Sequence, residues 1–233
     1  MKENRKYQHV FFDLDRTIWD FDKNSRETIR EIFFKYKLDR IIEEFSIFES
    51  TYRKFNKQLW ADYRLGRIKK DELRAKRFFL TLQEFGITDA KLASDFDSDY
   101  VSQSPLKKTL FPSAIDVLTY LRKKYDLYIL TNGFKETQAL KMSVSGLTSF
   151  FSMVITSEEA GVLKPDPVFF QFALHKIQAE AYECLMIGDD PEVDIQGAKN
   201  AGIDQVWFNP DQLENSIKPT YEISQLNSLK EII

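Results

Sequence analysis

Apolar runs of strand length alternate with helical segments over the second half of the chain, and this alternation constrains the fold more than any other feature. The runs are DLYILTNG, FSMVITS, ECLMIGDD and DQVWF, and the segments between them carry apolar residues at helical spacing. Such alternation predicts parallel strands joined by right-handed crossovers. Tyr7 to Phe12 near the start has the character of a further strand buried on both faces. We therefore predict a doubly wound α/β fold.

Residues 21–104 do not follow this alternation. Segments such as SRETIREIFFKYKL and FESTYRKFNKQLWADYRLG place apolar residues three and four positions apart, with Lys, Arg and Glu between them. That spacing is typical of amphipathic helices. The sequence thus predicts a core domain of residues 1–20 and 105–233 that is interrupted by an all-helical domain of residues 21–104. A chain of 233 residues is long enough for both.

Polar residues follow the predicted strands, and in open α/β sheets ligands bind beyond the carboxyl ends of the strands. These residues come from four places in the chain: Asp13, Asp15 and Thr17; Thr131, Asn132 and Gly133; Lys164; and Asp189, Asp190 and Asp194. Clustered carboxylates repel one another unless a cation lies among them, and oxygen-rich sites suit Mg²⁺. Lys164, the Thr131 hydroxyl and the amides near Gly133 suit the oxygens of a phosphate. The alternative is four unrelated loops with ordinary polar residues.

Composition excludes several other classes of function. The formal net charge of -3 gives no basic field that would attract a nucleic acid polymer. No segment approaches the ~20 apolar residues that cross a bilayer, and the first residues lack the apolar core of a signal peptide. The single cysteine, Cys184, excludes an internal disulfide and fits a reducing compartment, so the cytoplasm is the expected location. The sequence leaves the oligomeric state open.

Four short segments, taken in order, resemble the four motifs of the haloacid dehalogenase (HAD) superfamily. DLDRT matches the first motif, LTNG the second, Lys164 in LKPDP the third and GDDPEVD the fourth. The resemblance spans almost the whole chain. It implies a Rossmann-like core with a cap, and an insert directly after the first motif is the position of a helical cap. Hydrolysis of a small-molecule phosphomonoester with Mg²⁺ as cofactor is the activity that it implies.

The resemblance also implies roles for the acidic residues. Asp13 would be the nucleophile that forms an aspartyl-phosphate. Asp15 would protonate the leaving oxygen and then activate the hydrolytic water. The Asp13 side chain, the Asp15 backbone carbonyl and Asp189 would bind Mg²⁺. Asp194 would orient the metal's waters or Lys164, and Asp190 is a weaker candidate for the same role.

Thr131 and Lys164 would stabilise the charge of the transferred phosphoryl group. One position departs from the superfamily pattern, because Arg16 stands where glycine is frequent. We expect the Arg16 side chain to project toward solvent, with extra charge near the cap as the alternative.

The second acid of the first motif favours phosphoryl chemistry over dehalogenation. A halide leaves unprotonated, whereas an alkoxide benefits from a proton donor such as Asp15. Two non-enzymatic alternatives are a receiver-like signalling domain and a catalytically inactive phosphate-binding module. A receiver domain has no place for the helical insert of residues 21–104.

Local segments resemble the bacterial pyrimidine nucleoside 5′-monophosphatase branch of the superfamily. These segments are Trp19-Asp20-Phe21, LWADYRLGRI, LTNGF and VWFNP. Aromatic side chains stack on nucleobases, and the candidates are Trp19, Phe21, Trp60 and Tyr63. Packing within the protein explains these aromatics equally well. A sugar-phosphate phosphatase and a β-phosphoglucomutase-like enzyme are the enzymatic alternatives.

Overall fold

The computed structural model describes residues 6–233 and divides the chain into two compact units. The core unit consists of the residues up to Phe21 together with Lys108–Ile233, and the helical unit consists of Asp22–Lys107. Each unit has its own cluster of buried apolar side chains. They are described separately below.

The core unit is built on a six-stranded sheet in which all neighbouring strands are parallel, with the order β3-β2-β1-β4-β5-β6. The strands are β1 (His9–Phe12), β2 (Asp126–Thr131), β3 (Met153–Thr156), β4 (Cys184–Gly188), β5 (Asp204–Phe208) and β6 (Tyr221–Ile223). Phe12, the last residue of β1, is in register with Ile129 and Ile187 on its two neighbours. The ends of β2, β1 and β4 therefore meet at one edge. The predicted α/β class with a doubly wound parallel sheet is confirmed.

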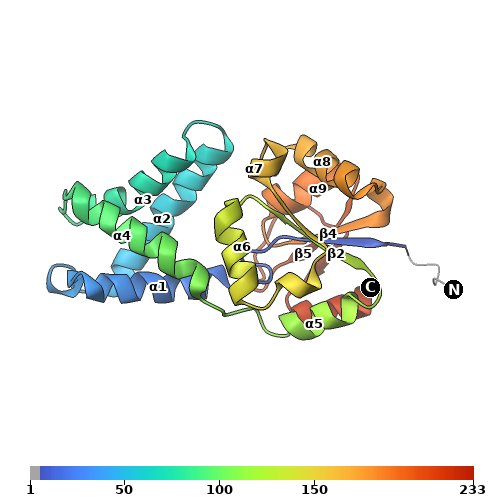
Figure 1. The fold of residues 1–233 in the computed structure, drawn as a ribbon, viewed down its shortest axis with the longest axis horizontal. Coiled ribbons are helices and arrows are strands. Elements are labelled where there is room, and N and C mark those ends of the chain that lie inside the picture. The colour runs from blue at the N-terminus through green and yellow to red at the C-terminus, as the bar shows by residue number, and fades with distance from the viewer. Residues whose placement is uncertain (1–5) are drawn as a thin grey trace. The chain divides into compact units, whose positions relative to one another are not determined.

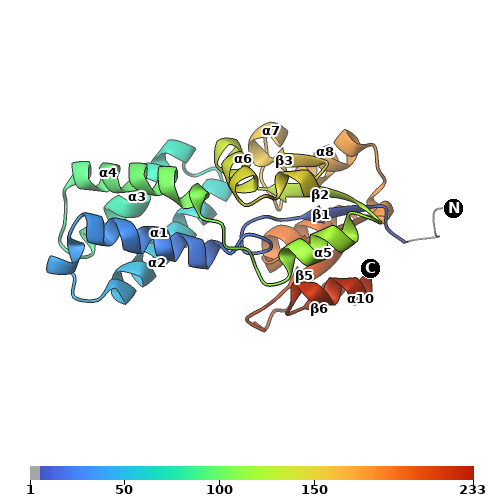
Figure 2. The ribbon, with the colours of Figure 1, turned by 60° about the horizontal axis from the view of Figure 1, so that its bottom comes forward.

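Both faces of the sheet are buried, which explains the nearly continuous apolar character of its strands. Val10 and Phe12 contribute to one apolar cluster, and Phe11 between them contributes to the other. Figures 1 and 2 show helices on both sides of the sheet. The first cluster includes residues of α5 (Ala114–Leu121), α6 (Lys135–Val144) and α10 (Leu229–Ile232), and α5 lies beside α10 in Figure 2. The second includes residues of α7 (Ser157–Ala160), α8 (Pro167–Ile177) and α9 (Gly197–Asn200).

Two parts of the core unit differ from the sequence-based expectation. The segment PEVDIQGAKNAG, expected to be one helix, forms a π-helical turn over Pro191–Gln196 followed by the short α9. The strand β6 and the helix α10 were not predicted. Both are too short to show a clear period in the sequence, and they are held by the sheet edge and by Leu229, which is fully buried.

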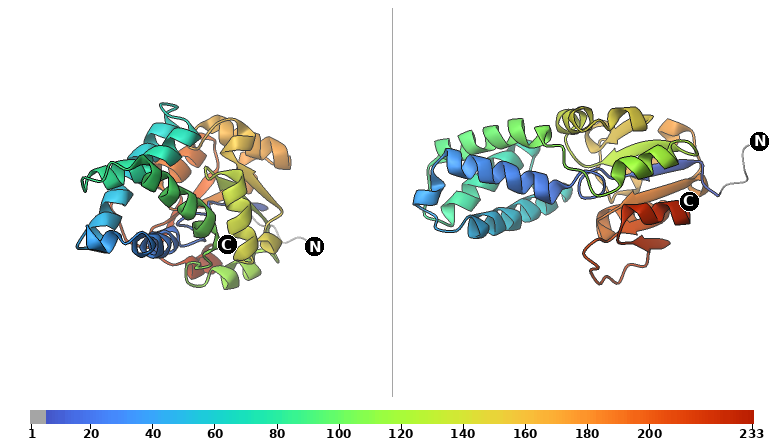
Figure 3. Two further views of the ribbon diagram at one scale, coloured as in Figure 1. Left: turned by 60° about the vertical axis from the view of Figure 1, so that its left-hand side comes forward. Right: turned by 90° about the horizontal axis from the view of Figure 1, so that it is seen from below.

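The α-helices of the helical unit are α1 (Phe21–Lys35), whose first residue belongs to the core unit, α2 (Phe45–Arg64), α3 (Lys70–Gln83) and α4 (Ala90–Gln103). Figure 3 shows these helices, coloured blue to green, packed together. Aromatic side chains fill their interior: the rings of Phe78 and Phe96 lie 4.7 Å apart between centroids, and those of Tyr52 and Phe78 lie 4.9 Å apart. Within residues 6–233, the structure contains no helix with the length and apolarity to cross a membrane.

The burial of Cys184 at the start of β4 gives a prediction about its reactivity. Burial, together with the charge of Glu183, raises the pKa of the Cys184 thiol to about 12, so the reactive thiolate is scarce below that pH. We expect no reaction with Ellman's reagent within minutes at pH 8 in native buffer, and reaction of one thiol per chain in concentrated urea. Rapid stoichiometric labelling of the native protein would contradict the burial.

Candidate active site

Lys164 lies between the ends of three adjacent strands and connects them. Its ammonium donates to Asp13 Oδ1 at 2.7 Å, to Asp194 Oδ1 at 2.6 Å and to the Leu130 carbonyl at 2.7 Å. Asp13 directly follows β1, Leu130 lies in β2, and Asp194 lies in the turn after β4. The Lys164 side chain is 1% exposed, so all three hydrogen bonds of this ammonium are shielded from water.

Burial sets the protonation behaviour of the carboxylates around Lys164. Burial raises the pKa of Asp13 to about 7; Lys164 opposes the shift and Asp194 adds to it. Burial also raises the pKa of Asp194 and of Asp189, and for Asp189 the charges of Asp194 and Asp13 add to the effect. Burial alone would lower the pKa of Lys164, but Asp13 and Asp194 outweigh it and raise that pKa. The cluster thus holds more negative charge than its single ammonium balances.

The surplus charge fits a divalent cation. Carboxylate oxygens of Asp13, Asp189 and Asp194 all lie within 4.8 Å of one another. When ionised, the three carboxylates and one ammonium leave two unbalanced negative charges. Thr17, which is fully buried, donates to Asp189 Oδ1 at 3.4 Å and holds this carboxylate rather than facing outward. An all-oxygen donor set of this charge suits Mg²⁺.

Asp194 is fixed by the π-helical turn that begins after β4. Its Oδ1 accepts from Lys164, and its Oδ2 accepts from the backbone N–H of Asp190 at 3.2 Å. The Asp190 side chain instead caps the turn by accepting from the N–H groups of Glu192 and Val193. A side chain at position 188 would clash with Asp194, which explains the glycine there. Since both Asp194 oxygens are engaged, its geometry favours an orienting role over direct metal binding.

Thr131, at the end of β2, has its hydroxyl oriented by two donors. Its Oγ1 accepts from Gln138 Nε2 at 2.8 Å and from the Gly133 N–H at 3.0 Å. A hydroxyl has two acceptor positions and one hydrogen, so this hydrogen is left to donate to a third group. Gly133 has no room for a side chain because Gln138 packs against its α-carbon. The threonine is thereby prepared to donate to an anionic oxygen.

Asn132 positions Lys164 rather than presenting its own amide. Its Nδ2 donates to the Lys164 carbonyl at 2.9 Å, and its Oδ1 accepts from the Lys164 N–H at 2.8 Å. This paired contact fixes the loop that carries Lys164 against the end of β2. A contribution of Asn132 to a phosphate site stays a prediction, and its side-chain amide is engaged by the Lys164 backbone.

Asp15 is held by two side chains that the sequence analysis did not identify. Lys141 Nζ donates to Asp15 Oδ1 at 2.6 Å, and Gln138 Nε2 donates to Asp15 Oδ2 at 2.9 Å. Both partners lie on the buried face of α6. The same helix buries Met142 and leaves Leu140 39% exposed, so its apolar residues do not mark one buried face in the sequence. One feature of the sequence could have identified them: Gln138 and Lys141 are three residues apart, so they lie on the same face of the helix that follows the second motif.

The four candidate aromatics lie in different surroundings. Trp19 is fully buried in the core unit, with the Lys141 ammonium 4.3 Å from its ring centre, which favours packing over stacking on a base. Phe21 is partly buried, and the Arg16 guanidinium lies 5.4 Å from its ring centre. Trp60 and Tyr63 are partly exposed on α2 of the helical unit, where their rings pack edge to face at 5.7 Å.

Arg16 has the backbone conformation that explains the preference for glycine at this position. Its φ angle is 65°, in the left-handed region that glycine adopts without strain. The residue is exposed, and its guanidinium lies over Phe21. The residue thus reaches solvent and an aromatic ring, and its charge also acts on Asp189, whose pKa burial raises against the smaller opposing effect of Arg16.

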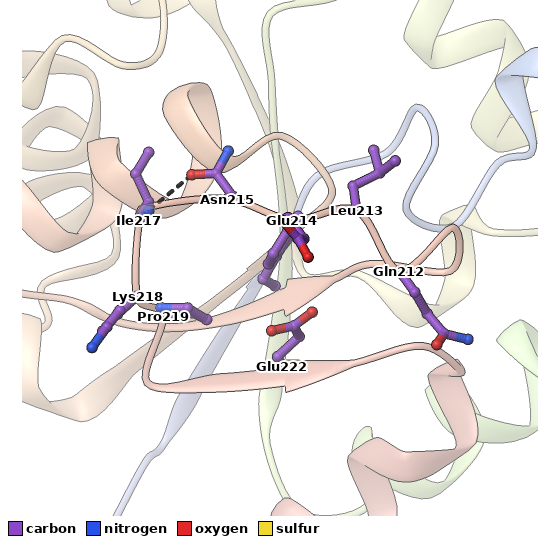
Figure 4. Close-up of a pocket in the computed structure, with 9 residues that line it drawn as sticks. Gln212, Leu213, Glu214, Asn215, Ile217, Lys218, Pro219 and Glu222 are labelled. Atoms are coloured by element: carbon purple, nitrogen blue, oxygen red, sulfur yellow. Dashed lines mark hydrogen bonds between the residues drawn. The ribbon is translucent and has the colours of Figure 1, made fainter.

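An open hollow of about 550 Å³ lies apart from these carboxylates, along the segment between β5 and β6. Figure 4 shows Leu213, Lys218 and Glu222 among its lining residues, with Asn215 Oδ1 accepting from the Ile217 N–H at 2.8 Å. Asp13, Asp189 and Asp194 do not line it. Its Trp207 connects it to the strand ends, because Nε1 donates to the Asp189 carbonyl at 2.9 Å.

Known proteins resemble this chain along most of its length. A family model described as haloacid dehalogenase-like hydrolase matches residues 7–202. The pyrimidine 5′-nucleotidase PynA of Streptococcus pneumoniae is 33% identical over 227 residues, which cover 96% of this chain and 93% of PynA. Human N-acylneuraminate-9-phosphatase is 30% identical over 236 residues, with 96% of this chain and 92% of that protein covered.

A solved structure agrees with the fold. The crystal structure of the HAD-hydrolase YfnB from Bacillus subtilis bound to magnesium superposes with a TM-score of 0.89 at 33% identity, covering 98% of this chain and 99% of that chain. Together with the family match and the relatives above, this identifies the chain as a member of the haloacid dehalogenase-like hydrolase family.

Proposed function

We propose that this hydrolase is a Mg²⁺-dependent phosphomonoesterase that works through an aspartyl-phosphate on Asp13. The observation that carries the proposal is the buried cluster in which Lys164 balances only part of the charge of Asp13, Asp189 and Asp194. The Thr131 hydroxyl, with its hydrogen left to donate, supports a phosphate site beside the cluster.

In the first step, a carboxylate oxygen of Asp13 bonds to phosphorus as the bond from phosphorus to the leaving oxygen breaks. Lys164 and Thr131 counter the negative charge on the transferring group. Asp15 gives a proton to the leaving oxygen, so that an alcohol departs instead of an alkoxide. In the second step, water loses a proton to Asp15 and attacks phosphorus, which releases inorganic phosphate and restores Asp13.

The carboxylates of Asp13 and Asp189 and the backbone carbonyl of Asp15 would hold the Mg²⁺ ion, with Asp194 orienting its surroundings. When bound, the ion would balance the surplus carboxylate charge and draw electron density from the phosphoryl oxygens. The helical unit, proposed as the cap domain, would contribute to the choice of substrate, with Trp60 and Tyr63 as its candidate aromatics.

For the substrate, we propose pyrimidine nucleoside 5′-monophosphates. The similarity to PynA over nearly the whole chain supports this class, as do the local segments around Trp19 and Trp60. A sugar-phosphate substrate is the second candidate, and the similarity to N-acylneuraminate-9-phosphatase favours it.

Replacing the proposed nucleophile tests the chemical mechanism. Asp13→Asn should abolish hydrolysis of p-nitrophenyl phosphate, because an amide does not form the phosphoenzyme. The wild type should lose activity with EDTA and regain it with Mg²⁺. Release of nitrophenolate measures both effects, and wild-type circular dichroism of the variant is the folding control. Appreciable turnover by Asp13→Asn would refute the role of Asp13.

Lys164→Met should reduce stability as well as activity. The substitution leaves the buried carboxylates of Asp13 and Asp194 without their ammonium, and breaking such a pair costs about 3–5 kcal/mol. Urea unfolding measures the loss in free energy of unfolding. The control is Lys230→Met, which removes a more exposed ion pair with Asp116 and should cost about 0–1 kcal/mol. Equal effects of the two variants would show that the buried pairs are not significant for stability.

Comparing phosphate esters tests the substrate class. With Mg²⁺, kcat/KM should be higher for UMP, dUMP and dTMP than for glucose 6-phosphate and other sugar phosphates. Trp60→Leu should raise KM for UMP about 5- to 100-fold, the loss of one stacking contact, and leave KM for glucose 6-phosphate, which has no aromatic ring, unchanged. Efficient hydrolysis of sugar phosphates with background rates on the nucleotides would replace the first substrate proposal with the second.

A further inference from the structure

Lys141 is a buried lysine that the mechanism above does not use. It is 4% exposed, although it lies on a surface helix, and lysine is rarely buried without a specific partner. Its ammonium donates to Asp15 Oδ1 at 2.6 Å and lies 4.3 Å from the ring centre of Trp19. A carboxylate and an aromatic face are the two kinds of group that stabilise a desolvated ammonium. The position of this nitrogen is therefore well defined.

Asp15, in contrast, is less buried than Lys141, so burial alone does not fix the direction of its carboxyl. Its side chain is 27% exposed, so water could solvate the carboxylate in several rotamers. Two donors from α6 select one of them, with Lys141 on Oδ1 and Gln138 on Oδ2 at 2.9 Å. Gln138 is fully buried and fixed in turn by its contact with Thr131. Both oxygens of Asp15 are thus tied to the helix that also supports the phosphate-binding threonine.

We propose that Lys141 is a positioning residue that acts through Asp15, holding this carboxyl where it exchanges protons with the leaving oxygen and the attacking water. The inference rests on the proposed function and extends it to a residue on α6. Loss of Lys141 would leave the Asp15 carboxyl held only on Oδ2 by Gln138 and more open to water, so its position is less well defined and proton transfer suffers while the fold persists. A displacement of about 1 Å in a reacting group can lower a rate about 100-fold.

Substrates whose leaving groups differ in their need for a proton distinguish a positioning role of Lys141 from a purely structural one. Both UMP and glucose 6-phosphate release a primary alkoxide that needs a proton, whereas p-nitrophenolate leaves without one. The ratio kcat/KM covers the steps up to formation of the phosphoenzyme, in which only the alkyl ester needs the acid. Misplacement of Asp15 should therefore lower kcat/KM for alkyl esters selectively. Water activation in the second step should become slow for both kinds of ester.

The experiment uses Lys141→Met, which keeps the length of the side chain and removes its charge. For UMP or glucose 6-phosphate, whichever the wild type hydrolyses faster, we expect kcat/KM to fall about 10- to 100-fold. For p-nitrophenyl phosphate we expect kcat/KM within about 3-fold of the wild type, with a pre-steady-state burst of nitrophenolate as the phosphoenzyme accumulates. A crystal structure of the variant should show Asp15 displaced or in more than one rotamer.

Two further variants complete the test. Asp15→Asn and the double variant Asp15→Asn/Lys141→Met should have equal kcat/KM on the alkyl ester, because Lys141 has no carboxyl left to position. Lys230→Met removes another lysine–aspartate pair of the core unit, and it should leave kcat/KM for both kinds of ester unchanged.

Several outcomes would overturn the inference. These are an equal loss on both kinds of ester, no loss on either, a double variant clearly worse than Asp15→Asn, or an unmoved Asp15 in the variant crystal structure. Each leaves the proposed function standing if the wild type is an active Mg²⁺-dependent phosphatase. A wild type inert toward all phosphate esters, or an active Asp13→Asn, would instead refute the proposed function and the inference with it.

Discussion

The buried ammonium of Lys164 is the interaction on which the rest of the site depends. It holds Asp13 after β1, the Leu130 carbonyl in β2 and Asp194 after β4, so three strand ends share one cation. Because the sheet places β2, β1 and β4 side by side, one lysine reaches all three. A buried ammonium without carboxylate partners is strongly disfavoured, and so are these carboxylates without the ammonium. The strand order therefore brings these buried charges together, and their mutual neutralisation makes their burial at the strand ends possible.

Lys164 neutralises only part of the carboxylate charge, and the unneutralised charge points to the function of the site. Asp189 joins Asp13 and Asp194 within 4.8 Å, and the pKa of each of these carboxyls is raised, mainly by burial. A protein selected for stability alone would replace such a group with an apolar side chain or pair it with a second lysine. Retention of the surplus charge is reasonable where a cation from solution completes the cluster. A buried set of repelling carboxylates is thus better evidence of a metal site than an exposed acidic loop.

The sequence predicts which strand ends form this site better than it predicts the hydrogen bonds between their side chains. Strand ends are readable because buried parallel strands are continuous apolar runs, and Asp13, Thr131 and Asp189 each follow such a run. Hydrogen-bond partners are not readable in this way. The same two-oxygen side chain serves as a cap in Asp190 and as a partner of Lys164 in Asp194, and only the π-helical turn distinguishes them.

Helix α6 shows why residues that contact the proposed site cannot all be identified from hydrophobic periodicity. Amphipathic analysis assigns apolar residues to the buried face, yet α6 buries Gln138 and Lys141 and leaves Leu140 partly exposed. Met142 still packs in the apolar core, and the two polar side chains are tolerated beside it because Asp15 and Thr131 accept hydrogen bonds from the Gln138 amide nitrogen and Asp15 accepts one from the Lys141 ammonium. These partners come from the turn after β1 and from the end of β2, so nothing in the local sequence of α6 reveals them.

Gln138 links the two groups of the proposed mechanism that it contacts, Asp15 and Thr131. One amide nitrogen donates to the proposed proton-transfer group, Asp15, and to the proposed phosphate-binding hydroxyl, Thr131. Rotation of either partner would leave an N–H of a fully buried amide without an acceptor, which costs about 1–3 kcal/mol. The carboxyl and the hydroxyl are therefore oriented together before any substrate binds. Groups fixed in this way need little reorganisation as charge develops in the transition state, which is the condition under which polar groups lower a reaction barrier most effectively.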